Sequence, residues 1–147
     1  MVHTLIIGRC MTGKSTLAKK IVEQAGDHRK ILVFDPNYDN WPGATWQTAN
    51  KDTFINKFWS IKNSICVVDE SGDIDKFDDE LKICTTRGRH LGNILIFIAH
   101  RLNQLQPVVR NQCTKLYLFK TGIDDCIDLS RQYAEPLLTQ AADLPVG

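Results

Sequence analysis

Hydrophobic residues occur along the chain in short runs that alternate with longer segments of helical period. Five runs rich in β-branched and other apolar residues predict strands, at residues 4–7, 30–34, 65–68, 94–99 and 115–119. Apolar residues at spacings of three and four predict helices between them, at residues 14–24, 52–61 and 74–87, with one more in the tail from Asp124. This alternation is typical of an α/β protein with a mostly parallel sheet. We expect one domain over residues 1–147.

Two connections have a distinctive composition. The first follows Asp35 and contains Tyr38, Trp41 and Trp46, and we expect a loop that packs on the core or forms a lid, with base stacking as the alternative. The second connects the last two predicted strands, and Pro107 predicts a short turn there.

Composition narrows the class of protein. The 147 residues are 43% hydrophobic and 24% charged, with a net charge of +1, which is enough apolar material for a core and excludes a disordered chain. The near-neutral balance argues against a broad nucleic-acid-binding surface. The apolar stretch at residues 91–99 is too short to cross a bilayer, and the first residues lack a signal-peptide pattern. We expect a cytoplasmic protein without a membrane span, placed in the host cytoplasm or at a virion vertex if it is viral.

The cysteines occur singly, without a CxxC pair, and several lie within apolar runs. This spacing favours reduced packing residues over a metal site or a disulfide framework. The set comprises Cys10, Cys66, Cys84, Cys113 and Cys126.

A phosphate-binding pattern follows the first predicted strand directly. Residues 8–16 read GRCMTGKST and match GxxxxGK[ST] at each fixed position. Glycines allow the loop to turn its N–H groups toward phosphate oxygens at a helix N-terminus. Lys14 would contact the β and γ phosphates of ATP, and Ser15 would place its hydroxyl on Mg²⁺. The expected nucleotide-binding residues are Gly8, Arg9, Cys10, Met11, Thr12, Gly13, Lys14, Ser15 and Thr16.

An acidic pair ends the third predicted strand. Asp69 and Glu70 follow an apolar run, at the end of the strand where ligands of open α/β sheets bind. Asp69 would hold Mg²⁺, and Glu70 could polarise a water for in-line attack on the γ-phosphate. The pair therefore predicts an ATPase that depends on Mg²⁺.

The order of these motifs resembles the additional-strand, catalytic-glutamate division of P-loop ATPases. One strand separates the P-loop from the acidic pair, and another follows the pair and ends at His100. The resemblance implies a three-layer, RecA-like fold with the expected strands in the order 5-1-4-3-2. It places His100 between the two motifs, where it would sense the γ-phosphate or orient the water.

The segment before the fourth strand carries a narrower resemblance. Arg89 and Gly92 precede the apolar strand and His100, and Asp35-Pro36 ends the second strand, as in the FtsK–HerA superfamily of DNA-translocating ATPases. The small size is most similar to the genome-packaging ATPases of internal-membrane, tectivirus-like viruses. The resemblance implies that Arg89 is an arginine finger, with Arg87 as its rival. His100 departs from the family pattern, which usually has Gln at the sensor position.

The leading interpretation is a motor that hydrolyses ATP and translocates double-stranded DNA. The resemblance implies a homo-oligomeric ring, low sequence specificity for DNA, and viral portal or vertex proteins as partners. Scattered cations could line the pore of such a ring, namely Arg101, Arg110, Lys115 and Lys120.

Three alternatives share the P-loop. A small-molecule or nucleotide kinase needs an arginine-rich lid, for which Arg87, Arg89 and Arg101 are the candidates. A GTPase is disfavoured because the base-reading Asn-Lys-x-Asp pattern is absent. Filamentous-phage assembly proteins of the same superfamily carry a membrane span, which the sequence does not predict.

Overall fold

The computed structural model describes residues 2–9, 13–26, 28–69 and 75–144, and it describes only the backbone of residues 75–78. A sheet of six parallel strands forms its centre, in the order β3-β2-β4-β5-β1-β6. The strands are β1 (Thr4–Ile7), β2 (Ile31–Phe34), β3 (Trp46–Thr48), β4 (Ile65–Asp69), β5 (Ile94–Ala99) and β6 (Lys115–Leu118).

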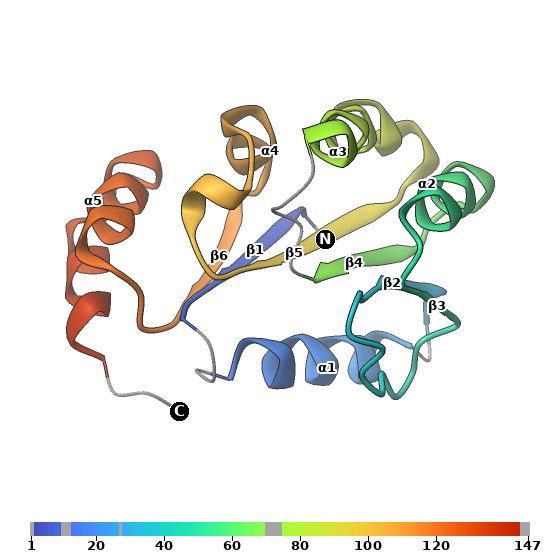
Figure 1. Cartoon of the computed structure of the whole chain (residues 1–147), viewed down its shortest axis with the longest axis horizontal. Coiled ribbons are helices and arrows are strands. Elements are labelled where there is room, and N and C mark those ends of the chain that lie inside the picture. Colours follow the sequence, from blue (N-terminus) through green and yellow to red (C-terminus); the bar gives the residue numbers. More distant parts are fainter. Residues whose placement is uncertain (1, 10–12, 27, 70–74, 145–147) are drawn as a thin grey trace.

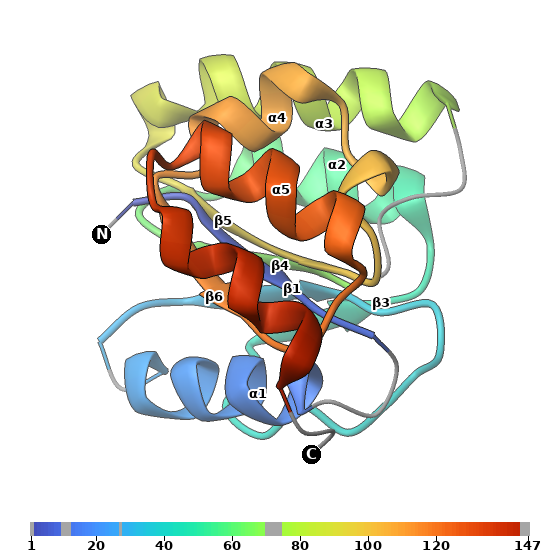
Figure 2. The same ribbon diagram turned by 90° about the vertical axis from the view of Figure 1, so that its left-hand side faces the viewer.

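Helices cover the two faces of the sheet unequally. Figures 1 and 2 show α1 on one face and α2, α3, α4 and α5 on the other, which gives three layers. The helices are α1 (Lys14–Ala25), α2 (Lys51–Ser60), α3 (Asp75–Arg87), α4 (Pro107–Gln112) and α5 (Ile123–Gln132). Short 3₁₀ helices occur at Gly88–Leu91, Leu102–Gln104 and Pro136–Asp143.

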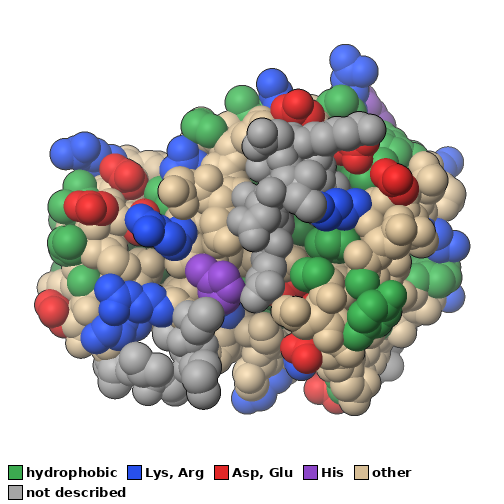
Figure 3. All heavy atoms as spheres, viewed as in Figure 1, with side chains coloured by type: hydrophobic (Ala, Val, Ile, Leu, Met, Phe, Trp, Pro, Cys, Tyr) green, Lys and Arg blue, Asp and Glu red, His purple; other side chains and the backbone are tan. Residues whose placement is uncertain are grey.

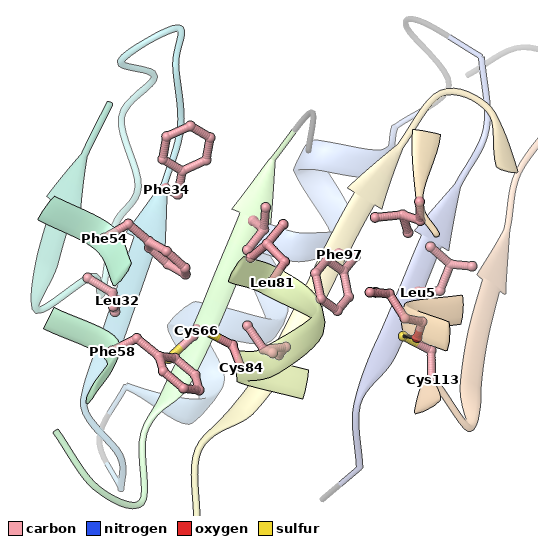
Figure 4. Close-up of a cluster of buried hydrophobic side chains, with 14 of the residues drawn as sticks. Leu5, Leu32, Phe34, Phe54, Phe58, Cys66, Leu81, Cys84, Phe97 and Cys113 are labelled. Atoms are coloured by element: carbon pink, nitrogen blue, oxygen red, sulfur yellow. Dashed lines mark hydrogen bonds between the residues drawn. The ribbon is translucent and has the colours of Figure 1, made fainter. Parts of the chain in front are cut away.

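The two-residue period of the strands divides the hydrophobic core into two parts. In β1, Leu5 and Ile7 pack under α2 to α5, whereas Ile6 points to the α1 face, where Ala18 and Val22 cover it. Figure 4 shows the larger part, in which side chains of the central strands meet those of α2 and α3. Its aromatic and aliphatic members include Phe34, Phe54, Phe58, Leu81 and Phe97, each at most 2% exposed. Burial on both faces explains why the strands are continuous apolar runs.

The expected strand order is confirmed, with one addition. The five expected strands correspond to β1, β2, β4, β5 and β6, and these lie in the order 5-1-4-3-2. The sixth strand, β3, pairs with β2 through Leu32–Trp46 and Phe34–Thr48, so the expectation of a loop as far as Trp46 was wrong. Its three residues are half-buried or exposed, and they therefore lack the apolar run that reveals the other strands.

The connection between β5 and β6 contains a helix, α4, where the sequence predicted only a short turn. Pro107 occupies the first turn of α4, where its missing N–H costs nothing and its fixed φ suits a helix. The tail helix is confirmed as α5, followed by the 3₁₀ helix at Pro136–Asp143.

The cysteines confirm the packing interpretation wherever the structure describes them. Cys66, Cys84, Cys113 and Cys126 are buried and free, and Cys10 lies outside the described residues. Burial raises the pKa of the Cys84 and Cys113 thiols to about 12. These groups are therefore protonated and unreactive in the folded chain.

Helix length also bears on membrane insertion. Within the described ranges, none of the helices is both long and apolar enough for a transmembrane span.

Candidate nucleotide-binding site

The sequence-predicted residues gather at one edge of the sheet because the strands are parallel and in register. Ile7 is paired with Ala99 of β5 and with Leu118 of β6, and Asp69 is paired with Ile98. The carboxyl ends of four strands therefore fall within about one residue of each other. Gly8, Asp69 and His100 lie at this carboxyl edge, as the strand pattern predicted.

Hydrogen bonds to both neighbouring strands hold the start of the P-loop. The Gly8 N–H donates to the Ala99 carbonyl at 3.2 Å, and the Arg9 N–H donates to the Lys120 carbonyl at 2.8 Å. At the other end, Gly13 has a φ of 99°, a left-handed conformation that favours glycine, and it caps the N-terminus of α1. Residues 10–12 lie outside the described part, so the expected roles of Cys10, Met11 and Thr12 stay predictions.

Lys14 connects the P-loop with the end of β5. Its side chain is 5% exposed, and its Nζ donates to the Arg9 carbonyl at 2.7 Å and lies 3.2 Å from Nδ1 of His100. An ammonium group only donates hydrogen bonds, so Nδ1 of His100 must accept and its proton sits on Nε2. A buried cation needs such polar partners. The contact brings the predicted phosphate-binding and sensor residues together.

Two side chains that the sequence did not reveal fix the backbone after β5. Oε1 of Gln104 accepts from the N–H groups of His100 and Arg101, at 2.6 and 2.9 Å. Oδ2 of Asp125, on α5, accepts from the buried N–H of Leu102 at 3.0 Å. Glutamine and aspartate are common on protein surfaces, and no pattern in the sequence distinguishes these two.

The residues predicted to hold Mg²⁺ offer suitable oxygen donors. Ser15 lies in the first turn of α1, and Asp69 is 4% exposed at the end of β4. Within the described residues, no three or more His, Cys, Asp or Glu side chains gather into a metal site by themselves. The Ser15 hydroxyl and the Asp69 carboxylate fit Mg²⁺, because this ion keeps several waters and takes further oxygens from nucleotide phosphates. Glu70, the predicted base, lies outside the described residues.

A cavity of about 470 Å³ adjoins Arg9 and His100 at the same edge. Its walls come from the P-loop, the end of β5 and the connection between β6 and α5, and they include Arg9, His100, Thr121 and Ile123. A cleft of this size suits part of a nucleotide. Figure 3 has the same view as Figure 1, in which α5 lies on the left. On that side of the surface, Lys and Arg side chains are interspersed with Asp and Glu.

Arg89 lies at the opposite edge of the sheet. It is in the 3₁₀ helix that precedes β5, and its Nη2 donates to Oε1 of Gln112 at 3.0 Å. Because β5 has six residues at about 3.3 Å each, Arg89 is roughly 20 Å from His100. The rival Arg87, the last residue of α3, is exposed near the same amino edge. Neither arginine belongs to this chain's own P-loop site.

The four cations considered for DNA do not form one patch. Arg101 and Lys120 follow the carboxyl ends of β5 and β6, whereas Lys115 begins β6 at the amino edge. Arg110, on α4, is half-buried, and its Nε has no hydrogen-bond partner. The structure therefore separates these residues onto two edges of the sheet.

Solved structures resemble this architecture closely. The DNA-packaging ATPase B204 from Sulfolobus turreted icosahedral virus matches with a TM-score of 0.76 and 18% identity, over 99% of this chain and 88% of its own. The chain has the fold of a viral DNA-packaging ATPase. The genome-packaging NTPase B204 from Sulfolobus turreted icosahedral virus 2, solved in complex with sulfate, matches with a TM-score of 0.80. Its identity is also 18%, over 99% of this chain and 87% of its own. The predicted resemblance to a small genome-packaging ATPase is confirmed at the level of the fold.

Two further solved structures share this fold over part of their own length. The cytoplasmic domain of EssC has a TM-score of 0.59 and 15% identity, over 99% of this chain and 46% of its own. RuvB from Thermotoga maritima has a TM-score of 0.60 and 16% identity, over 90% of this chain and 42% of its own. No protein-family model matches the sequence, and no curated protein matches it by sequence.

Proposed function

We propose that the chain is a subunit of an ATP-hydrolysing motor that packages double-stranded viral DNA. The observation that carries the proposal is the contact between Lys14 of the P-loop and His100 at the end of β5, beside the strand that ends in Asp69. The fold supports it, since the genome-packaging NTPase B204 has been solved with AMPPCP, AMP and ATP-gammaS.

Each residue of the carboxyl edge has a distinct task in this proposal. Lys14 binds the β and γ phosphates, exchanging its bond to the Arg9 carbonyl for phosphate oxygens. Ser15 and Asp69 would hold Mg²⁺, which would neutralise negative charge on the phosphates. Glu70 accepts a proton from the attacking water. His100 detects the terminal phosphate through its contact with Lys14.

The position of Arg89 favours action on a neighbouring subunit. Since it lies roughly 20 Å from its own site, it can act only on a P-loop presented to the amino edge by another chain. A homo-oligomeric ring in which the amino edge of one subunit faces the carboxyl edge of the next meets this requirement. An arginine finger contributes about 10³ to 10⁵ in rate.

Duplex DNA is the proposed cargo, held through its phosphates without reading the sequence. The near-neutral net charge of +1 leaves each subunit few phosphate contacts, so the ring supplies affinity collectively. A viral portal or vertex protein is the proposed docking partner. The proposed location is the host cytoplasm or the virion vertex.

Two variants test the division of labour at the carboxyl edge. Lys14→Ala should weaken ATP binding, because it removes the buried cation that contacts the phosphates. Glu70→Gln should still bind ATP but lose about 10²-fold or more in turnover, a typical general-base effect. Equilibrium binding of a fluorescent ATP analogue and steady-state phosphate release separate the two defects. Turnover by Glu70→Gln close to that of the wild type would remove Glu70 from the mechanism.

A mixing experiment tests the assignment of Arg89. Arg89→Ala and Lys14→Ala should each be inactive alone, and their mixture should regain activity where an intact Arg89 faces an intact P-loop. Co-assembly is checked by light scattering in the same samples. If the co-assembled mixture stays inactive, Arg89 does not act between subunits.

A further inference from the structure

A second cavity, of about 280 Å³, opens at the amino edge of the sheet, away from the P-loop. It is formed by segments that precede β1, β2, β4 and β5. Its wall includes His3, Arg29, Asn63, Arg89, Gly92 and Asn93. Arg89 therefore lines the same cavity as Arg29, a residue that no pattern in the sequence indicated.

Two arginines line this cavity, and the described residues of its wall include no Asp or Glu. Nη1 of Arg29 is buried and has no hydrogen-bond partner. Within the described ranges, neither Arg29 nor Arg89 is within ion-pair distance of a carboxylate. Two arginines without a carboxylate partner give the cavity positive charge, which an anion bound there would offset.

Two other polar side chains of the wall, those of His3 and Asn93, are held by hydrogen bonds to the backbone. Nδ1 of His3 accepts from the Leu95 N–H at 3.0 Å, and Nε2 lies 3.3 Å from the Thr85 carbonyl, which makes the ring neutral. The Asn93 amide donates to the carbonyls of Phe58 and Ile61, both at 3.0 Å. Since His3 is neutral, the cationic groups of the described wall are the two arginines.

The backbone beside Arg89 is closely packed as well. Gly92 has a φ of 73°, and a Cβ there would lie 2.2 Å from Oδ1 of Asn63. Glycine is required at this turn, which closes the wall beside Arg89 and keeps the cavity at a fixed shape.

We propose that this cavity is a binding site for a phosphoryl group, with Arg29 and Arg89 as its two ligands. Paired guanidinium groups match the oxygens of a phosphoryl group through charge-assisted hydrogen bonds, and the volume admits such a group. The phosphoryl group has two possible sources. It is either free inorganic phosphate or the terminal phosphate of the nucleotide on a neighbouring subunit, and the second source rests on the proposed function.

The binding test uses the Lys14→Ala chain, in which the competing P-loop site is removed. Inorganic phosphate is titrated at constant ionic strength while the Cε1–H signal of His3 is followed by NMR. A saturable shift is expected. Arg29→Met should lower the affinity for phosphate about tenfold or more, since the substitution deletes charge-assisted hydrogen bonds. Arg131→Met, a change at an exposed arginine of α5, is the matched control and should leave the affinity unchanged.

Two results would overturn the site. One is the absence of a saturable shift, and the other is equal affinity in the Arg29→Met and Arg131→Met backgrounds. If Arg29→Met does not fold, as judged by its amide spectrum, Arg89→Met at an exposed position replaces it and should show the same tenfold loss.

ATP hydrolysis then distinguishes the two sources. If the phosphate belongs to the neighbour's nucleotide, Arg29→Met should be slow alone and should recover when mixed with Lys14→Ala. If Arg29→Met loses phosphate binding but hydrolyses ATP like Arg131→Met, the ligand is free phosphate. A wild-type chain without ATPase activity would refute the proposed function, while the phosphate titration would still decide the site.

Discussion

Replacing Asp125 by alanine should release the segment that follows β5. Its carboxylate is 8% exposed and accepts from the N–H of Leu102, a residue that is 1% exposed and two positions after His100. Alanine leaves this N–H buried without a partner. The bond links α5 to the segment that follows His100, so its loss should affect both stability and the site.

The expected loss follows from this single hydrogen bond. An unsatisfied buried donor costs about 1–3 kcal/mol in the free energy of unfolding. For a chain of this length, that corresponds to a decrease of roughly 3–10 °C in Tm. Asp125→Asn keeps an oxygen acceptor and loses only the charge near the N-terminus of α5, which costs about 1 kcal/mol or less. The difference between the two variants isolates the bond to Leu102.

Chemical denaturation of the wild type, Asp125→Asn and Asp125→Ala measures these differences, with phosphate release measured on the same samples. The alanine variant should be the least stable and should also have the lowest turnover, because His100 loses its anchored neighbour. If alanine and asparagine lower the free energy of unfolding equally, the Leu102 bond contributes nothing and the reasoning is wrong.

Three further predictions concern the core and its edges. Burial lowers the pKa of His3, so the unfolded chain binds the proton more readily, and urea denaturation should show stability falling as the pH drops below about 6.5, less steeply in His3→Gln. A Cβ on Gly88 would lie 2.4 Å from the buried Phe58 ring, so Gly88→Ala should lower the free energy of unfolding by about 1–3 kcal/mol, whereas Gly122→Ala, with nothing within 4 Å, should not. A small thiol reagent should label at most one cysteine in the native chain and five after denaturation, because four are buried, namely Cys66, Cys84, Cys113 and Cys126.

Much of the fold could be predicted from the sequence because most strands are buried on both faces. Such strands appear as apolar runs, and Ile94–Ala99 is buried along its whole length. The edge strand Trp46–Thr48 escaped prediction because it is short and partly exposed, so nothing but its pairing with β2 defines it. Helix α4 escaped because its six residues are too few to show a helical period.

The carboxyl edge was predictable for a different reason. Its residues follow strand ends directly, and parallel register brings the ends of neighbouring strands together, as with Lys14 and His100. Asp125 bonds Leu102 from another helix, and Arg29 lines a cavity with Arg89, over separations that no local pattern encodes. Gln104 bonds the backbone of His100 and Arg101 within a 3₁₀ turn that is too short to show a period. The sequence therefore predicted which residues lie at the strand ends but not the residues that position them.

The most direct test of the account is ATP hydrolysis measured over a range of chain concentrations, with and without duplex DNA of two unrelated sequences. Turnover per chain should rise with concentration, because Arg89 must meet a neighbour's site. Both DNA sequences should stimulate it equally, and the stimulation should fade as salt rises. The account would be contradicted if DNA changed nothing while a nucleoside monophosphate received the γ-phosphate stoichiometrically, which is the behaviour of a kinase.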